Sequence, residues 1–308
     1  MTKTDTTYLN DLLGSQAISD DSQEMKNLRA QRDEVETLIK ATFPTGKIRY
    51  GGSKAKGTMI KESYDLDLVC YFPHDETAAG ATLKDLYKNV SKKLADKYIV
   101  QEKTSAIRLL SAQEATKGTY THVDVVPGRY TDSTNSDCYL YQNGGDKERL
   151  KTNLDTHISH IRDSALTDAL KLLKLWRVLN GINVKQFAFE LLGVDILKDK
   201  KNAVLSDQLQ HFFETVSKAE KPITVEDPAN PTGNDLMPLL SSAWPHLQSL
   251  ATQTIDTIQT TGWDSVFGKS DSAENSPIHQ QLSAAIHVAQ QHQPTKPWSA
   301  YSLYTTLV

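Results

Sequence analysis

Hydrophobic and polar residues follow two different periods along the first part of the chain. Residues 22–42 place apolar side chains three and four positions apart with charges between them. This period predicts one long amphipathic helix, with Asp20 or Asp21 as its cap. Apart from two aspartates, residues 65–72 are β-branched, aromatic or apolar, and a proline follows them, which predicts a buried strand.

The remaining segments divide the chain into a sheet-forming and a helical part. A glycine-ended strand, two more strands and a helix are expected before residue 150, while apolar helices separated by polar loops are expected after it. The sequence therefore predicts an α+β fold, with a mixed-sheet lobe over 1–150 that includes the long N-terminal helix, and a helical lobe over 151–308. The segments behind this prediction are 48–53, 105–110 and 121–130 for strands, 82–97, 167–180 and 187–197 for helices, and 218–235 and 264–277 for loops.

Composition excludes several classes of protein. No run of about 18 apolar residues occurs, which argues against a membrane span, and the N-terminus lacks the pattern of a signal peptide. Cys70 and Cys138 are the only cysteines, too few for a disulfide framework, so we expect a cytoplasmic protein. The chain has 34 basic and 38 acidic residues, so its net charge of −4 offers no general attraction to nucleic acid.

A glycine-rich turn is the first candidate for chemistry. Gly51 and Gly52 precede Ser53 at the end of a predicted strand. Backbone N–H groups at such a turn, together with a serine hydroxyl, are suited to holding the phosphates of a nucleotide. One of three nearby lysines is expected to neutralise a triphosphate; the candidates are Lys54, Lys56 and Lys61.

Three aspartates form the second candidate. Asp65 and Asp67 are two positions apart on a strand, so their carboxylates face the same side, and Asp124 lies alone in another apolar strand. A bare Asp-x-Asp is usually a solvated strand edge. A glycine turn, an Asp-x-Asp and a later aspartate in an apolar strand together predict a metal site, because unpaired buried carboxylates are costly. Carboxylate oxygens suit Mg²⁺.

These residues resemble a known family. GGSKAKGT with YDLDLV, followed by HVDVVPGRY, is similar to the cGAS/DncV-like nucleotidyltransferases of the DNA polymerase β superfamily. That group includes oligoadenylate synthetases and bacterial cyclic-oligonucleotide synthases. The resemblance implies a polymerase-β-like mixed-sheet lobe, with the helical lobe completing the nucleotide pocket.

The resemblance also assigns residues in the second half. LLKLWR implies that Lys174 reaches the donor triphosphate, and KQFAFELL implies that Phe187 stacks on the donor base, where a tyrosine is common. Residues 227–234 are similar to the loop that closes against the nucleotide. Without the resemblance, Lys174 would be read as a solvated charge and Phe187 as a core residue.

The implied activity is the joining of nucleoside triphosphates, ATP among them, into a cyclic di- or oligonucleotide second messenger for anti-phage signalling of the CBASS type. Pyrophosphate is released, and two Mg²⁺ ions, or Mn²⁺ in their place, are held by Asp65, Asp67 and Asp124. The product would act on a downstream effector protein, with no membrane and no obligatory nucleic acid.

Three alternatives stay open: a linear oligoadenylate synthetase, an RNA or tRNA 3′-end nucleotidyltransferase, and an inactive partner module. The acidic excess argues against the first two, because a polynucleotide needs a basic face. The intact carboxylates argue against the third. Base identity, linkage, ring size and any regulatory partner are left open by the sequence.

Overall fold

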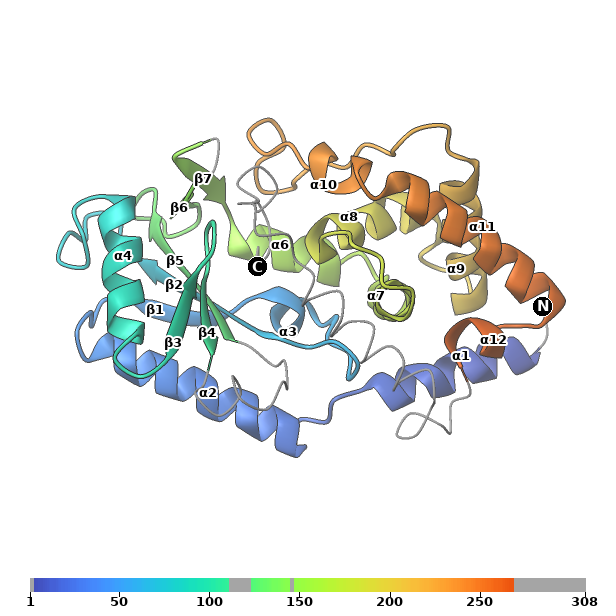
Figure 1. The fold of residues 1–308 in the computed structure, drawn as a ribbon, viewed down its shortest axis with the longest axis horizontal. Coiled ribbons are helices and arrows are strands. Elements are labelled where there is room, and N and C mark those ends of the chain that lie inside the picture. Colours follow the sequence, from blue (N-terminus) through green and yellow to red (C-terminus); the bar gives the residue numbers. More distant parts are fainter. Residues whose placement is uncertain (1–2, 111–122, 145–146, 269–308) are drawn as a thin grey trace.

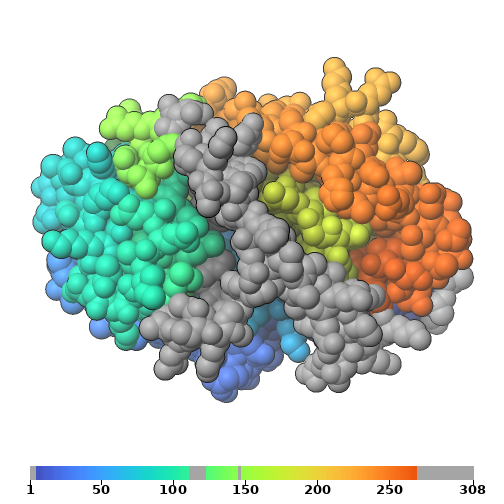
Figure 2. Space-filling model, in the orientation of Figure 1, coloured from blue at the N-terminus to red at the C-terminus, as the bar shows by residue number. Residues whose placement is uncertain are grey.

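The computed structural model describes residues 3–110, 123–144 and 147–268. Within these ranges a sheet with its own helices lies at one end of the molecule and a group of helices at the other (Figure 1). Figure 2 shows the two ends as the blue-to-green and the yellow-to-red halves of the same face. The α+β fold predicted from the sequence, with a mixed-sheet lobe and a helical lobe, is confirmed.

Seven strands form one mixed sheet in the described part of the chain. Their order is β1-β2-β5-β4-β3, with β6 paired to β5 and β7 paired to β6. The β2–β5 pair is parallel and has the longest register of the sheet, whereas the other pairs are antiparallel. The strands are β1 (Lys47–Tyr50), β2 (Leu66–Phe72), β3 (Ile99–Glu102), β4 (Ile107–Leu110), β5 (Val123–Tyr130), β6 (Cys138–Tyr141) and β7 (Arg149–Thr152).

One face of the sheet packs on two helices of its own lobe. Alternate residues of β2, Leu66, Leu68 and Cys70, are fully buried in a core shared with α2 (Gln23–Lys40) and α4 (Leu83–Leu94). Successive side chains of a strand point to opposite faces. The residues between these leucines therefore face away from α2 and α4.

The opposite face looks toward the helical lobe. Val69, Tyr71 and Val126 are buried in a second core, which continues into the helices of the C-terminal half. Asp67 and Asp124 lie two positions before Val69 and Val126, so the strand period places both aspartates on this face. The candidate site is thereby located between the two lobes.

The helical lobe is built around a buried tryptophan. Trp176 is 0% exposed, and its indole N–H donates to Thr254 Oγ1 at 3.0 Å. No helix of the described residues is long and apolar enough to cross a membrane. The helices are α6 (Leu154–Arg162), α7 (Thr167–Leu179), α8 (Gln186–Leu197), α9 (Leu205–Lys218), α10 (Met237–Ser241), α11 (Trp244–Thr260) and α12 (Asp264–Phe267), with a 3₁₀ turn at Lys198–Lys200.

The N-terminal segment runs along both lobes as two helices (Figure 1). The predicted helix over 22–42 appears as α2 on the sheet lobe, whereas α1 (Lys3–Gln16), which the sequence did not predict, packs against α7 and α9. A lobe boundary at residue 150 stays a prediction.

The expected cap of α2 was wrong by one or two residues. Ser22 is the N-cap, since its side chain accepts a hydrogen bond from the Met25 N–H at 3.1 Å. A cap must lie directly before the first helical residue to reach that N–H. Asp20 instead forms an ion pair with Arg29.

A buried ion pair joins the two lobes. Lys56 ends α3 (Gly52–Lys56), and its ammonium donates to Glu190 of α8 at 2.5 Å, while the Thr58 hydroxyl donates to the other Glu190 oxygen at 2.7 Å. The Lys56 and Glu190 side chains are 3% and 1% exposed. Burial alone would raise the pKa of Glu190, but Lys56 and Thr58 hold it below its usual value. Of the three lysines beside the glycine turn, Lys56 is thus engaged by a protein carboxylate.

We expect Lys56→Met to destabilise the protein by about 3–5 kcal/mol, because it leaves the Glu190 charge buried without its counter-ion. Lys218→Met is the control, since Lys218 pairs with Glu214 at the surface and should lose no more than about 1 kcal/mol. Urea denaturation of each variant measures the free energy of unfolding. Equal losses in the two variants would contradict a special role for the interlobe pair.

Candidate active site

Two carboxylates lie side by side on the sheet face that looks toward the helical lobe, and a third comes shortly before them in the chain. Asp67 lies directly opposite Asp124 in the parallel register of β2 and β5, and Asp65 comes just before β2. Asp124 is 1% exposed, while Asp65 and Asp67 are half-buried. Burial, and after it the carboxylates of Asp124 and Asp65, raise the pKa of Asp67 to about 8. Like charges this close favour a bound cation.

The glycine turn contacts the same carboxylates. The Gly51 N–H donates to the Asp67 carbonyl at 2.8 Å, which ties the turn to β2. Gly52 has a φ of +51°, and a Cβ at this position would lie 1.6 Å from Asp67 Oδ2. Only glycine therefore fits here. Ser53 follows in the first turn of α3 and is 8% exposed; its role in phosphate binding stays a prediction.

A buried lysine reaches this region from the helical lobe. Lys174 of α7 is 4% exposed, which is far from the solvated charge that its helix alone would suggest. Burial lowers its pKa to about 8, although Glu190 and Asp65 act in the opposite direction and Arg177 and Lys56 act with burial. Lys174 is thus within electrostatic range of Asp65, and it places a titrating cation near the carboxylates.

Phe187 is buried between polar neighbours. Its side chain lies in the core at 4% exposure, with the His157 ring centroid 4.7 Å away and Lys56 Nζ 5.6 Å from its own centroid. This low exposure is typical of a core residue. His157 and Lys56 lie against the ring, so one of them must move before a nucleotide base can stack on it. The stacking role implied by the family resemblance stays a prediction.

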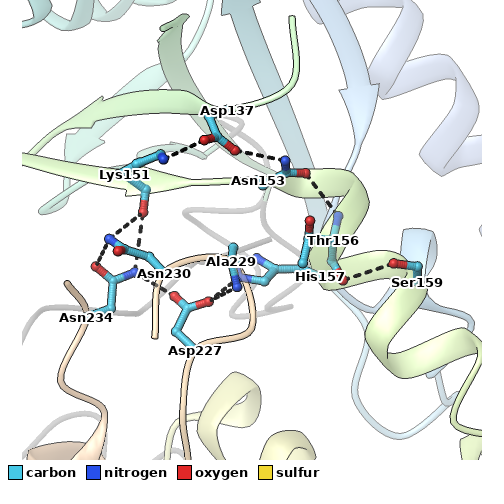
Figure 3. Close-up of polar contacts among 10 residues, drawn as sticks. All are labelled: Asp137, Lys151, Asn153, Thr156, His157, Ser159, Asp227, Ala229, Asn230 and Asn234. Carbon is cyan, nitrogen blue, oxygen red and sulfur yellow. Dashed lines mark hydrogen bonds and ion pairs between the residues drawn. The ribbon is translucent and has the colours of Figure 1, made fainter. Parts of the chain in front are cut away.

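The loop at 227–234 is held against α6 by Asp227 and against β7 of the sheet lobe by Asn230 and Asn234, as Figure 3 shows. The Asp227 carboxylate is 0% exposed and accepts hydrogen bonds from His157 Nε2 at 2.7 Å, from the Ala229 N–H at 2.8 Å and from the Asn234 amide at 2.5 Å. Asn234 and Asn230 also donate to the Lys151 carbonyl of β7. The loop that resembles a nucleotide-closing loop therefore contacts α6 and β7, with Asp227 as its anchor.

Arg108 of β4 binds the third aspartate. Its Nε and Nη2 donate to the two oxygens of Asp124 at 2.9 and 2.7 Å. Three carboxylates are a suitable donor set for Mg²⁺. In residues 3–110, 123–144 and 147–268, however, no three acidic, histidine or cysteine side chains are arranged to hold a metal ion. The chemistry of the donor set fits a divalent ion, while the present partner of Asp124 is a guanidinium.

Comparison with known proteins identifies the sheet lobe. Residues 28–125 match the family model described as a nucleotidyltransferase domain. The chain carries a nucleotidyltransferase domain. No curated protein sequence matches it, so the wider relationship comes from structure.

The whole fold is shared with solved cyclic-nucleotide synthases. Vibrio cholerae DncV, a cyclic AMP-GMP synthase described as a prokaryotic cGAS homolog, superposes with a TM-score of 0.65 at 15% identity, over 87% of this chain and 98% of DncV. CdnC of E. coli MS115-1, in its complex with HORMA-deltaN, gives 0.62 at 17% identity over 87% and 96%. CdnG of Bradyrhizobium diazoefficiens, in complex with GTP, gives 0.63 at 14% identity over 86% and 97%. The resemblance read from the motifs is confirmed for domain and fold.

Sequence reasoning missed three residues that contact the candidate site residues: Arg108 binds Asp124, Glu190 binds Lys56, and His157 packs on Phe187. Arg108 is the single charge in SAIRLL, and Glu190 is the single charge in FAFELL. The reasoning that singled out Asp124, that a charge in an apolar strand or helix needs a partner, applies equally to both. His157 carries no such signal, because its helix is amphipathic and mixes polar with apolar residues around it.

Lys174 predicts a pH dependence of nucleotide binding. A triphosphate favours the charged ammonium, so affinity for a non-hydrolysable ATP analogue should be highest below the Lys174 pKa of about 8. It should then fall by up to about tenfold per pH unit as the free protein loses that proton. Calorimetric titration across about pH 7 to 10 measures this. Lys174→Met should flatten the profile, and Lys171→Met, which removes a surface lysine paired with Asp168, should leave it intact.

Phe187→Ala separates stacking from core packing. We expect a stability loss of about 3–5 kcal/mol from the buried ring, together with a loss of about 1–3 kcal/mol in binding of the ATP analogue if the ring also carries a base. Phe212→Ala is the control, since Phe212 is fully buried in the same core on α9 and should lower stability alone. Unchanged nucleotide affinity in Phe187→Ala would contradict the stacking role.

Proposed function

We propose that this protein joins nucleoside triphosphates, ATP among them, into a cyclic di- or oligonucleotide second messenger and releases pyrophosphate. The observation that carries the proposal is the placement of Asp67 directly opposite Asp124 on the face between the lobes, with Gly52 packed against the Asp67 carboxylate. Supporting it, the fold is that of DncV and CdnG over most of both chains.

The proposed enzyme depends on divalent metal, with Mg²⁺ as the physiological ion and Mn²⁺ as a substitute. Asp65, Asp67 and Asp124 are the residues that would hold two ions, since their oxygens are hard ligands on one face of the sheet. When bound, such ions activate a ribose hydroxyl and stabilise the charge of the departing pyrophosphate.

The chain's own residues position the substrates. Ser53 and the backbone of the turn at Gly52 hold the donor phosphates, and Lys174 adds a positive charge from the opposite lobe. Asp124 takes the proton of the attacking ribose hydroxyl on a carboxylate oxygen, directly or through water. Phe187 stacks on the donor base, and the loop anchored by Asp227 borders the pocket.

The proposed setting is cytoplasmic anti-phage signalling, in which the product acts on a downstream effector protein. Nucleic acid is not required, because the chain has no excess of basic residues to neutralise a polyphosphate backbone. The complex of CdnC with HORMA-deltaN suggests that a regulatory protein partner is a further possibility to test.

The deciding experiment incubates the purified protein with labelled ATP, GTP, CTP and UTP and a divalent ion. We expect a product that resists phosphatase, because a ring has no terminal phosphate. Asp65→Asn, Asp67→Asn and Asp124→Asn should each reduce its formation by at least about a hundredfold, the scale of losing one charged group in an active site. Asp75→Asn, at an exposed position beyond the far end of β2, should leave it unchanged.

The same reaction distinguishes the alternatives. A phosphatase-sensitive oligomer would identify a linear synthetase. Extension of an added RNA or tRNA 3′ end would identify a tailing enzyme, and no nucleotide transfer under any of these conditions would contradict the proposal. Nuclease treatment of the protein beforehand should not change the rate. Enhancement by added duplex of about tenfold or more, lost at high salt, would identify a nucleic-acid sensor.

A further inference from the structure

Arg108 forms an ion pair with Asp124, whose carboxylate the proposed reaction needs. It lies opposite Asp124 in the antiparallel register of β4 and β5, and its guanidinium binds both carboxylate oxygens. The Asp124 side chain is 1% exposed and that of Arg108 is 18% exposed. Bidentate pairs of this kind are the strongest ion pairs that proteins make, and their geometry is specific.

A divalent ion and Arg108 compete for the same oxygens. A metal ligand must turn a lone pair toward the ion, and both oxygens of Asp124 are already hydrogen-bonded to the guanidinium. Each oxygen keeps a second lone pair, so the competition is one of charge: a cation that binds Asp124 together with Asp67, its neighbour in the register, must lie beside the guanidinium or displace it from one oxygen.

We propose that Arg108 is a positioning residue, which holds Asp124 while the site contains no metal and releases it when a divalent ion binds. This inference rests on the proposed function, because it assumes that Asp124 is a metal ligand. It adds a competing cation to the site, so that metal affinity is set partly by the strength of a protein ion pair.

The surroundings of Arg108 support an exchange of partners. The anionic groups that act on it are Asp124, Asp65 and Asp67, which are the same three carboxylates that a metal would neutralise. Lys103, beside the β3–β4 turn, and Lys185, at the start of α8, bring positive charge toward it: burial and then Arg108 lower the pKa of both lysines. Once metal has neutralised the aspartates, the phosphates of a nucleotide are the anion that these three cations can share.

Competition between Arg108 and metal predicts that removing Arg108 strengthens metal binding, whereas removing a residue that supports the site would weaken it. Arg108→Gln keeps a polar side chain on β4 and removes the positive charge and the paired N–H donors of the guanidinium. If Arg108 competes with metal, this variant should bind metal more tightly than the wild type. If Arg108 merely supports the shape of the site, the variant should bind metal more weakly or equally.

The probe is Mn²⁺ titrated into the full-length, nucleotide-free protein by calorimetry and by electron paramagnetic resonance. We expect the Mn²⁺ dissociation constant of Arg108→Gln to fall by about tenfold or more, since a charge-assisted bidentate pair no longer has to be broken. Arg49→Gln is the matched control. Arg49 also forms a bidentate pair, with Asp155, but between β1 and α6 and at the surface, so its loss should leave Mn²⁺ binding unchanged.

Thermal melts supply an independent measurement on the same proteins. Mn²⁺ should raise the melting temperature of Arg108→Gln by more than that of the wild type, because at the same free-ion concentration a lower dissociation constant gives a larger stabilisation of the folded state. If Arg108→Gln does not fold, Arg108→Lys is the second variant, since it keeps the charge but loses the bidentate geometry. Its Mn²⁺ dissociation constant should lie below that of the wild type. Binding that is unchanged, weaker, or absent from every variant would overturn the proposal.

The outcomes separate this inference from the proposed function. Tighter Mn²⁺ binding by Arg108→Gln, with no nucleotide product from the wild type, would support the competition and contradict cyclic-nucleotide synthesis. A cyclic product from the wild type with no change in Mn²⁺ binding would support the function and contradict the role of Arg108.

Discussion

Charge buried between the two lobes is the constraint on which this structure depends. Asp65, Asp67 and Asp124 bring three carboxylates to one face of the sheet, and the parallel register of β2 and β5 allows no wide separation of Asp67 from Asp124. An unneutralised cluster of this kind is costly in a protein interior. The lobes supply counter-charges from both sides: Arg108 from the sheet and Lys174 from the helical lobe.

Polar contacts rather than apolar packing alone set the relation of the two lobes. Lys56 of α3 binds Glu190 of α8, and the 227–234 loop, which Asp227 holds against His157 of α6, donates hydrogen bonds to the Lys151 carbonyl of β7. Phe187 touches both His157 and Lys56, so it lies where these two contacts meet. Hydrogen-bonded buried charges tolerate little displacement, because a shift leaves each of them unpaired. They therefore hold α3 and α8 in one relative position.

The comparison with solved synthases shows how little sequence this fold requires. At 14–17% identity the chain still superposes on DncV, CdnC and CdnG over more than four-fifths of its length. In this chain the alternation of β2 buries one sheet face on α2 and α4 and turns the other toward the helical lobe. Gly52 illustrates a stricter demand, since any side chain there would collide with the Asp67 carboxylate.

The sequence by itself determined the elements and the candidate chemistry. Period and turn residues identified α2, β2 and α4 and the division into sheet and helical halves, because these signals depend on neighbours within a few positions. The motif around Gly52, Asp65 and Asp67 predicted a nucleotide and metal site, since its residues lie on one short turn and strand. The later motif predicted a role for Lys174 in this site only through its resemblance to a family.

Tertiary structure decided the partner of each charge. Three such contacts join residues that are 16 to 134 positions apart: Arg108 with Asp124, Lys56 with Glu190, and Phe187 with His157 and Lys56. Local period carries no information about such distances. A sequence shows that a lone charge in an apolar segment requires a counter-ion, but the register of β4 on β5 and the packing of α8 on α3 determine which residue supplies it.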